Sequence, residues 1–338
     1  LDHYGRPLPE MIKRTRVQAR QALVFAAASA AGYGVFRDHA RAAFSFLAQY
    51  AYNRQTGQFH ALLKREGIVA DPTQDLYDLA FVLLALAKLK AAGEEAIVTE
   101  WLPRWRAALL FHEAPRGWTE TPQGRLPRRQ NPHMHLFEAA LAYYEVSGEK
   151  DFLVIAEECL ALFRTVFLEK ESGLVLEYFD TDWHPVSPAE QVVEPGHMVE
   201  WTFLLSEYER VTGRPSGVEL RLLFDTALAI GLDDDKAFLL DSFTLDGRAT
   251  SSARRLWPQT ELLKASRILE ARGEVLPATF RPDAIYDRFY SAYLDTPVKG
   301  GWYDRFDTRG RLLSNYMPSS SFYHIYSALT VHGEFRSP

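Results

Sequence analysis

Six polar turns recur along this chain at intervals of about sixty residues, and two segments of helical periodicity lie between each turn and the next. The turns centre on Gly5, Gly67, Gly124, Trp183, Gly247 and Gly310, so successive steps are 62, 57, 59, 64 and 63 residues. Between the turns, apolar residues return at three- and four-residue spacing, which is typical of amphipathic helices. A repeat of this length restricts the chain to folds built from stacked helix pairs.

The periodic segments predict eleven helices. They span 9–31, 36–53, 75–91, 94–112, 133–146, 150–168, 196–211, 217–231, 257–271, 279–293 and 319–332. A helix pair cannot bury its apolar stripe alone, and six pairs closing into a ring solve this problem. We therefore predict an all-α fold, an (α/α)6 barrel with short β-hairpin loops that forms one domain over residues 1–338. Its first helix would lie outside the chain, and an open solenoid is the alternative.

Composition excludes several classes of protein. The chain is 47% hydrophobic and 24% charged, as soluble globular proteins are, and its net charge of −6 includes no basic stripe for nucleic acid. No apolar run approaches the roughly 18 residues of a membrane span. The single cysteine, Cys159, lies in an apolar run and predicts an inert core thiol. We expect a cytoplasmic protein without nucleic-acid or membrane partners.

Residues able to bind a ligand or move a proton share one phase of the repeat. Arg20 lies 15 residues after its turn and His135 lies 11 after its own, whereas His197, Glu261 and His324 each lie 14 after theirs. In a closed barrel the starts of these helices would meet at one mouth and face one cavity. The other histidines outside the motif of residues 131–138 lack this phase, and we predict them to be surface or structural: His3, His39, His60, His112, His184 and His332.

Four short motifs surround these positions: residues 131–138 (NPHMHLFE), 194–201 (EPGHMVEW), 255–261 (RLWPQTE) and 318–324 (PSSSFYH). In the first two, a histidine and a glutamate three residues apart share one helix face. A zinc or manganese site from His133, His135, His197 and Glu200 is the alternative interpretation. Neighbours two apart on a helix diverge by about 200°, so His133 and His135 are poor co-ligands. No nucleotide-binding loop is present. We therefore expect neither a metal nor a cofactor.

The order and spacing of these motifs, with residues 13–21 (KRTRVQARQ), resemble the acylglucosamine 2-epimerase family over nearly the whole chain. This family includes cellobiose 2-epimerases, mannose isomerases and sulfoquinovose isomerases, and the resemblance implies an (α/α)6 barrel. It implies that His197 and His324 are catalytic and that Arg20 binds substrate. Further pocket positions match Asn131, His135, Glu200, Trp257 and Glu261. Residues 319–321 are serines where cellobiose epimerases carry a tryptophan, which favours a monosaccharide and a mannose-isomerase relative.

The resemblance further implies a cofactor-independent enzyme that moves a proton at C1/C2 of a reducing sugar through a cis-enediol. Mannose-type aldose–ketose isomerisation is the main hypothesis, and N-acylglucosamine or cellobiose 2-epimerisation is the alternative. A glycoside or uronide hydrolase using Glu200 and Glu261, or a non-catalytic sugar-binding protein, would use the same fold. The expected partner is a monosaccharide or small oligosaccharide, and the expected state is a monomer or homodimer. The sequence does not decide whether a phosphorylated sugar is accepted, although Arg254 and Arg255 could meet an anion.

Overall fold

The computed structural model describes residues 1–331, which form two compact units. Unit 1 contains residues 1–8, 167–178 and the chain from residue 185 onward, whereas unit 2 contains residues 9–166 and 179–184. Each unit is built from helices joined by loops with short strands, so the predicted dominance of helix is confirmed. The prediction for His332 falls outside the described residues, as do the last residue of the helix predicted over 319–332 and the end of the domain predicted over 1–338.

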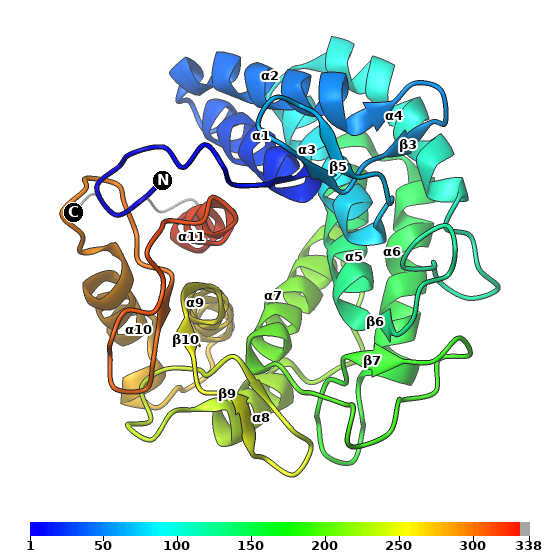
Figure 1. Cartoon of the computed structure of the whole chain (residues 1–338). Helices are drawn as coiled ribbons and strands as arrows, with labels where there is room; N and C mark the ends of the chain where they lie inside the picture. The colour runs from blue at the N-terminus through cyan, green and yellow to red at the C-terminus, as the bar shows by residue number, and fades with distance from the viewer. Residues whose placement is uncertain (332–338) are drawn as a thin grey trace. The chain divides into compact units, whose positions relative to one another are not determined.

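Unit 2 is built from three helix pairs. Its helices are α1 (Thr15–Ala30), α2 (Arg37–Phe46), α3 (Leu76–Ala91), α4 (Glu95–Leu110), α5 (Gln130–Ser147) and α6 (Lys150–Leu162). Helices α1, α3 and α5 lie side by side, and each packs on the helix that follows it in the chain (Figure 1). Because α3 has neighbours on several sides, its residues from Leu79 to Ala87 are all buried, which explains their continuous apolar character.

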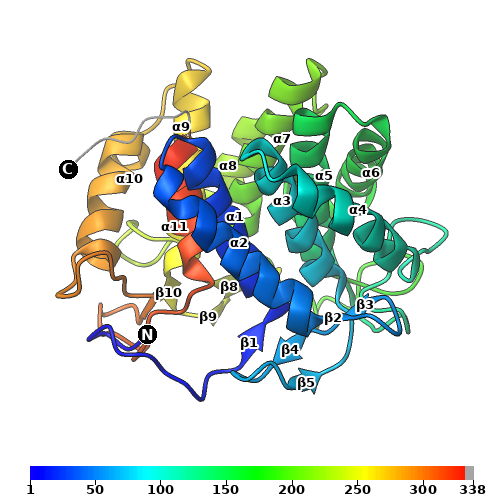
Figure 2. The same cartoon turned by 90° about the horizontal axis from the view of Figure 1, so that it is seen from above.

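Unit 1 repeats this arrangement with α7 (Pro195–Thr212), α8 (Leu220–Gly231), α9 (Leu256–Ala271), α10 (Pro282–Phe289) and α11 (Ser321–Thr330). Helix α9 contacts both α7 and α11, while α8 packs on α7 and α10 packs on α9 (Figure 2). Helices α7, α9 and α11 therefore correspond in unit 1 to α1, α3 and α5 in unit 2. No helix within residues 1–331 is both long enough and apolar enough to cross a membrane.

The strands are short and belong to the loops. They are β1 (Lys13–Arg14), β2 (Tyr52–Asn53), β3 (Gln58–Phe59), β4 (Leu62–Leu63), β5 (Val69–Asp71), β6 (Arg128–Arg129), β7 (Tyr178–Phe179), β8 (Ser242–Phe243), β9 (Ala249–Ser251), β10 (Arg254–Arg255) and β11 (Arg305–Phe306). The antiparallel hairpins β4–β5 and β8–β9 enclose two of the predicted turns. The helix predicted from residue 9 begins only at Thr15, because Lys13 and Arg14 pair with β4.

All six predicted turns contain a residue with positive φ. Five are glycines, which adopt this conformation without steric cost, and the fourth is Trp183 with φ of 68°. Unlike a glycine, Trp183 makes compensating contacts. The Arg128 guanidinium lies 3.7 Å from its ring centroid, and its indole N–H donates to the carbonyl oxygen of Arg116 at 3.1 Å. The sixfold repeat is therefore a repeat of backbone conformation, kept even where the glycine is replaced.

The single cysteine has the environment that the sequence predicted. Cys159 is buried in α6, and burial raises the pKa of its thiol well above the usual value. A thiol in this state is a poor nucleophile, because the reactive form is the thiolate. Cys159 is therefore a packing residue of unit 2.

Candidate active site

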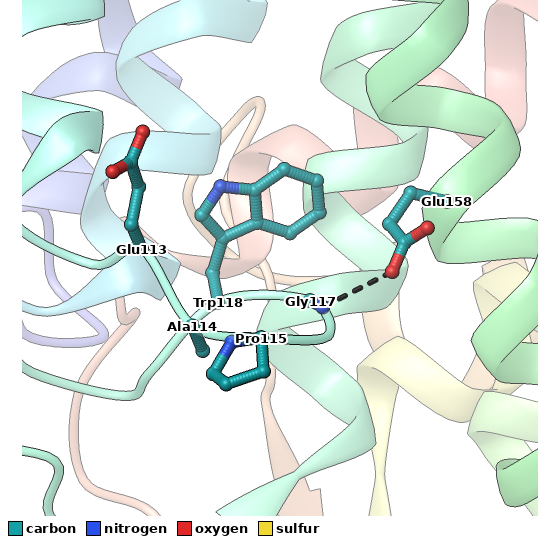
Figure 3. A pocket seen from close by; sticks show the side chains of 6 residues that line it. All are labelled: Glu113, Ala114, Pro115, Gly117, Trp118 and Glu158. Carbon is teal, nitrogen blue, oxygen red and sulfur yellow. Dashed lines mark hydrogen bonds between the residues drawn. The ribbon is translucent and has the colours of Figure 1, made fainter.

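Unit 2 carries an open groove of about 580 Å³ on its surface, lined by Glu113, Ala114, Pro115, Gly117, Trp118 and Glu158. Figure 3 shows the indole of Trp118 with Glu113 and Glu158 on either side, and Glu158 accepts a hydrogen bond from the backbone N–H of Gly117. None of the eight predicted site residues lines this groove. The predicted residues instead gather in two buried clusters, one in each unit.

In unit 1, His197 lies in the first turn of α7 and contacts two glutamates. Pro195 occupies the first helical position, where the N–H that proline lacks would have no partner in the helix. Nδ1 of His197 donates to Oε1 of Glu177 at 2.8 Å, and Oε2 of Glu194 lies 3.6 Å from the same nitrogen. His197 and Glu177 are both buried. This contact fixes the ring orientation and leaves Nε2 for another partner.

The charges around His197 favour its protonated form. Burial alone would lower the pKa of His197, but the carboxylates of Glu177, Glu194 and Glu200 outweigh burial and raise that pKa well above its usual value. Burial also raises the pKa of Glu194 to about 7. Because a protonated imidazole donates from both nitrogens, His197 presents a proton at Nε2. It therefore has the property that a general acid requires.

Also in unit 1, His324 forms a second histidine–glutamate pair. Its Nδ1 lies 2.9 Å from Oε1 of Glu261, a fully buried residue of α9. The other carboxylate oxygen, Oε2, lies 2.5 Å from Nζ of Lys264, which is 1% exposed. A carboxylate that accepts from Nδ1 fixes the tautomer, so that Nε2 is the ring nitrogen able to accept a proton. Both predicted catalytic histidines are thus oriented in the same way.

Trp257 contacts both histidines. Its ring centroid is 5.0 Å from that of His197 and 5.9 Å from that of His324. A Cβ at Gly196 would lie 2.4 Å from the Trp257 ring, so the start of α7 can approach the indole only because residue 196 has no side chain. The structure therefore brings together His197, His324 and Trp257, as the sequence predicted.

Glu200 completes the cluster of unit 1. It is buried on α7, and one ligand atom each from Glu200, Glu261 and His324 lie within 4.8 Å of one another. Glu177, Glu194 and His197 form a second set of the same size. Oxygen and imidazole donors of this kind can bind divalent metals, so these sets are where an ion would bind. In the first set, the Glu261 carboxylate already has Lys264 as a cationic partner. That the protein works without a metal stays a prediction.

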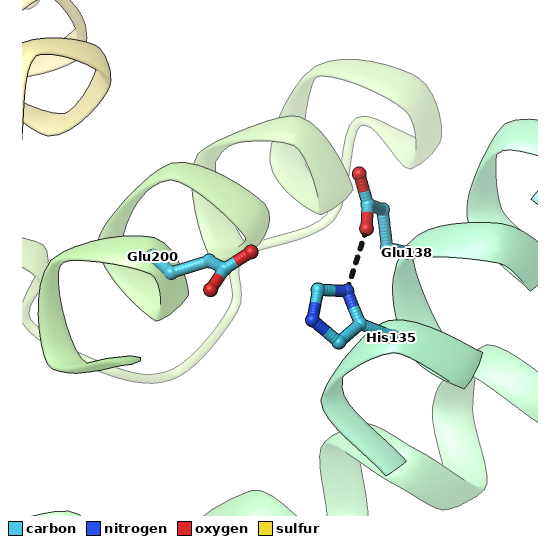
Figure 4. Close-up of side chains that lie close together, drawn as sticks. All are labelled: His135, Glu138 and Glu200. Atoms are coloured by element: carbon cyan, nitrogen blue, oxygen red, sulfur yellow. Dashed lines mark hydrogen bonds and ion pairs between the residues drawn. The ribbon is translucent and has the colours of Figure 1, made fainter. Parts of the chain in front are cut away.

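The cluster in unit 2 is built around aromatic rings of α3. His135 stacks on Tyr77 with ring centroids 5.0 Å apart, and its Nδ1 lies 3.0 Å from Oε2 of Glu138 (Figure 4). Arg20, on α1, donates to the Tyr77 hydroxyl at 3.0 Å and places its guanidinium 4.0 Å from the Phe81 ring centroid. Arg20 and His135 are therefore both buried against α3.

Asn131 lies in the first turn of α5. It is half-buried and precedes His135 by four residues, so both side chains share one face of the helix. With Arg20 and His135, this places all three site residues predicted in unit 2 around α3 and α5. The positions assigned from the family resemblance therefore form compact groups within each unit.

His133, two residues from His135, has a structural role. Its Nε2 accepts the backbone N–H of Trp118 at 3.2 Å, so Nδ1 is the donor to the carbonyl oxygen of Arg129 at 3.1 Å. Burial lowers the pKa of His133 to about 3. The ring is neutral and both nitrogens are bonded to the main chain. His133 therefore cannot ligate a metal beside His135, as its position on the helix predicted.

His133 predicts an acid-sensitive fold. The folded state holds it neutral down to about pH 3, whereas the unfolded state binds a proton near pH 6.5, so stability is lost as the pH falls through this interval. We expect a loss of about 1.4 kcal/mol per pH unit from this residue. Urea unfolding followed between pH 7 and pH 4.5 measures the slope, which His133→Gln should reduce. An unchanged slope in that variant would contradict the assignment.

Sequence reasoning missed several residues of these clusters. Glu177 precedes His197 by twenty residues in a loop segment, and no local spacing connects them. Tyr77 and Phe81 read as ordinary apolar positions of a helix. Of the residues missed, Lys264 could most easily have been predicted from the sequence, because it follows Glu261 by three residues and therefore lies on the same face of α9.

Comparison with known proteins agrees with this geometry. Residues 1–328 match the family model described as N-acylglucosamine 2-epimerase (GlcNAc 2-epimerase). The mannose-6-phosphate isomerase of Rhizobium meliloti (strain 1021) is 35% identical over 346 residues, covering 97% of this chain and 87% of that protein. The D-mannose isomerase of Thermobifida fusca is 28% identical, covering 91% and 80%.

A solved structure shows the fold. The cellobiose 2-epimerase from Bacillus thermoamylovorans B4167 matches with a TM-score of 0.85 at 17% identity, over 98% of this chain and 90% of that chain. Epimerase structures of this type are (α/α)6 barrels, so the predicted fold class is confirmed. That the chain forms one domain stays a prediction.

Proposed function

Because this chain belongs to the N-acylglucosamine 2-epimerase family, we propose that it interconverts a mannose-type aldose and its ketose. The chain is an enzyme of the sugar isomerase and 2-epimerase class. The two relatives described above are named for mannose 6-phosphate and mannose, and a mannose-type sugar is what these names share. The serines at 319–321 also favour a monosaccharide over a disaccharide.

One observation carries the proposed chemistry. Two imidazoles, each oriented by a carboxylate at Nδ1, contact the same indole, that of Trp257, at 5.0 and 5.9 Å between ring centroids. An isomerisation through an enediol needs a base for a carbon-bound proton and an acid for the carbonyl oxygen. Histidines serve both roles near neutral pH. A glycosidase would need a carboxylate pair and would leave both histidines without a role.

The proposed steps start from the open-chain aldose. Nε2 of His324 takes the proton from C2, the C2–H electrons form the C1=C2 bond, and the carbonyl electrons move to O1. His197 supplies the proton that O1 takes up, which gives a cis-enediol. Loss of the proton on O2 and return of one to C1 yields the ketose. Return to the opposite face of C2 yields the epimer instead, so one pair of histidines serves both outcomes.

The remaining predicted residues would bind the sugar. We assign Arg20, Asn131 and His135 to contacts with its oxygens, the role that the resemblance implies, and Glu200 to a hydroxyl group near His324. The cluster in unit 1 is rich in carboxylates, which repel a phosphate group, so we propose unphosphorylated mannose as the preferred substrate. A cytoplasmic location and a monomeric or homodimeric state complete the proposal.

Proton NMR in deuterated water tests the proposal. The protein is incubated with D-mannose, mannose 6-phosphate, N-acetylglucosamine or cellobiose, with EDTA and without added metal. We expect fructose to appear from D-mannose with deuterium at C1, because the transferred proton exchanges with solvent at the histidine.

The same spectra separate the alternatives. Glucose with deuterium at C2 would identify an epimerase, and turnover of N-acetylglucosamine or cellobiose would identify the family's other substrates. No exchange with any sugar, with or without divalent metal, would overturn the proposed chemistry.

A further inference from the structure

We propose that Lys264 is a positioning residue of the reaction, whose ammonium group balances the Glu261 carboxylate and thereby keeps His324 neutral and able to accept a proton. This inference rests on the proposed function, in which His324 is the base. It assigns to Lys264 a role that is exerted through its contact with Glu261.

The geometry is a chain of three buried groups. Nζ of Lys264 lies 2.5 Å from one carboxylate oxygen of Glu261, and the other oxygen lies 2.9 Å from Nδ1 of His324. The lysine and the glutamate are three residues apart on α9, on the face that also carries Trp257. The side chains of Lys264 and Glu261 are 1% and 0% exposed.

A lysine this deeply buried requires an explanation. Lysine is almost never fully buried unless it is paired, because removing its charge from water is costly. A surface pair at this spacing would be weak and screened by salt, but this pair is enclosed and therefore screened much less. Nζ also lies 4.3 Å from the ring centroid of Phe203. Lys264 thus places an ammonium group inside the cluster, next to the Glu261 carboxylate.

The two histidines show what this charge changes. His197 is surrounded by carboxylates, and they raise its pKa well above the usual value. His324 also contacts a carboxylate, but there the negative charge is balanced by Lys264 at its other oxygen. A lone carboxylate beside an imidazole favours imidazolium, whereas a balanced pair does so much less. The same type of side chain therefore acts as an acid at His197 and as a base at His324.

The other groups near this chain strengthen the need for a cation. Helix α7 contributes Glu200, with a carboxylate oxygen within 4.8 Å of ligand atoms of Glu261 and His324. Helix α11 contributes Tyr323 beside the imidazole. On the α10 side of α9, Ser266 donates to the Phe280 carbonyl oxygen, on the face opposite Lys264. Removing Lys264 would leave two carboxylates and no balancing ammonium beside His324.

The test is the pH dependence of kcat/KM for D-mannose isomerisation by the full chain. In Lys264→Met, His324 holds a proton more tightly beside the unbalanced Glu261 carboxylate. The acidic limb of the pH profile should therefore move up by about 1 to 2 pH units. Activity at neutral pH should fall roughly ten-fold or more and recover at higher pH. In Glu261→Gln the Lys264 ammonium group is left without its carboxylate and disfavours a proton on His324, so the acidic limb should move to lower pH. The double variant should return it to near the wild-type position.

A purely structural role for Lys264 would not produce shifts of opposite sign that cancel in the double variant. Arg267→Met is the matched control, because Arg267 is a cation on the same helix and donates to the Ala328 carbonyl oxygen of α11. Its limb should stay in place. If Lys264→Met does not fold, Lys264→Gln keeps a donor for the Glu261 carboxylate without the charge, and its limb should move in the same direction.

The outcomes separate this inference from the proposed function. An acidic limb that stays at the wild-type pH in Lys264→Met, with His324→Gln inactive, overturns the role of Lys264 alone. A His324→Gln variant with near-native turnover, or a wild-type protein that isomerises no sugar, overturns the proposed function itself.

Discussion

A His197→Gln variant is expected to fold normally and to lose about 10²–10⁴-fold in kcat. The glutamine amide keeps a donor for the Glu177 carboxylate, which accepts at 2.8 Å from the native ring, so the buried acceptor retains a partner. What the variant lacks is the Nε2 proton. The measurement is single-turnover isomerisation and deuterium uptake at C1 of the ketose, with circular dichroism to verify folding.

The pH profile of the same variant gives a second readout. Because carboxylates raise the pKa of His197, the wild-type enzyme should hold this proton through neutral pH and lose activity only in alkaline solution. That alkaline limb should vanish in His197→Gln. Glu177→Gln removes one of the charges, so its limb should move to lower pH.

His112→Gln is the matched control for a buried histidine. The His112 ring bonds the Gln74 side chain and the carbonyl oxygen of Thr119, both structural contacts within unit 2. We expect lower stability and near-native kcat from this variant. If His197→Gln behaved like His112→Gln, the acid role assigned to His197 would be wrong.

Much of the fold was predictable, because the repeat consists of local features of the sequence. Helix periodicity and turn glycines are read within a few residues, and the structure confirms eleven α-helices within residues 1–331. Even the fourth turn, where Trp183 replaces glycine, was placed by spacing alone. The error at 9–14 arose because strand pairing of Lys13 and Arg14 with Leu63 and Leu62 is a contact over about fifty residues, which no local pattern displays.

For the candidate site, the sequence indicated individual residues but not the partners that they contact. The histidines could be found because they recur at one phase of the repeat. The carboxylates that contact these histidines differ in how well the sequence predicts them. Glu261 shares that phase of the repeat, whereas Glu177 contacts His197 only because of the way its loop folds. Lys264 was missed for another reason, since charged residues on helices are usually solvated, and only burial shows that this one is not.

Gly196→Ala is expected to impair catalysis far more than stability. The added Cβ would lie 2.4 and 2.6 Å from two ring carbons of Trp257 and 3.1 Å from Cβ of Pro258, so the indole or the start of α7 must move. The ring cannot move freely, because it is packed against both His197 and His324. Displacing a group at the reacting centre by about 1 Å can cost 10²-fold in rate, and we expect a loss of this order in kcat/KM.

The stability cost should be smaller, because two effects oppose each other. Overpacking a buried site costs about 1–3 kcal/mol, whereas alanine is favoured over glycine in a helix by about 1 kcal/mol. Gly34→Ala is the matched control, since a Cβ there meets nothing within 4 Å, and it should leave kcat/KM and Tm unchanged. Adding Trp257→Phe to Gly196→Ala removes the clashing ring carbons and should restore Tm without restoring activity. A Gly196→Ala enzyme with wild-type kcat/KM would show that catalysis does not depend on the position of this indole.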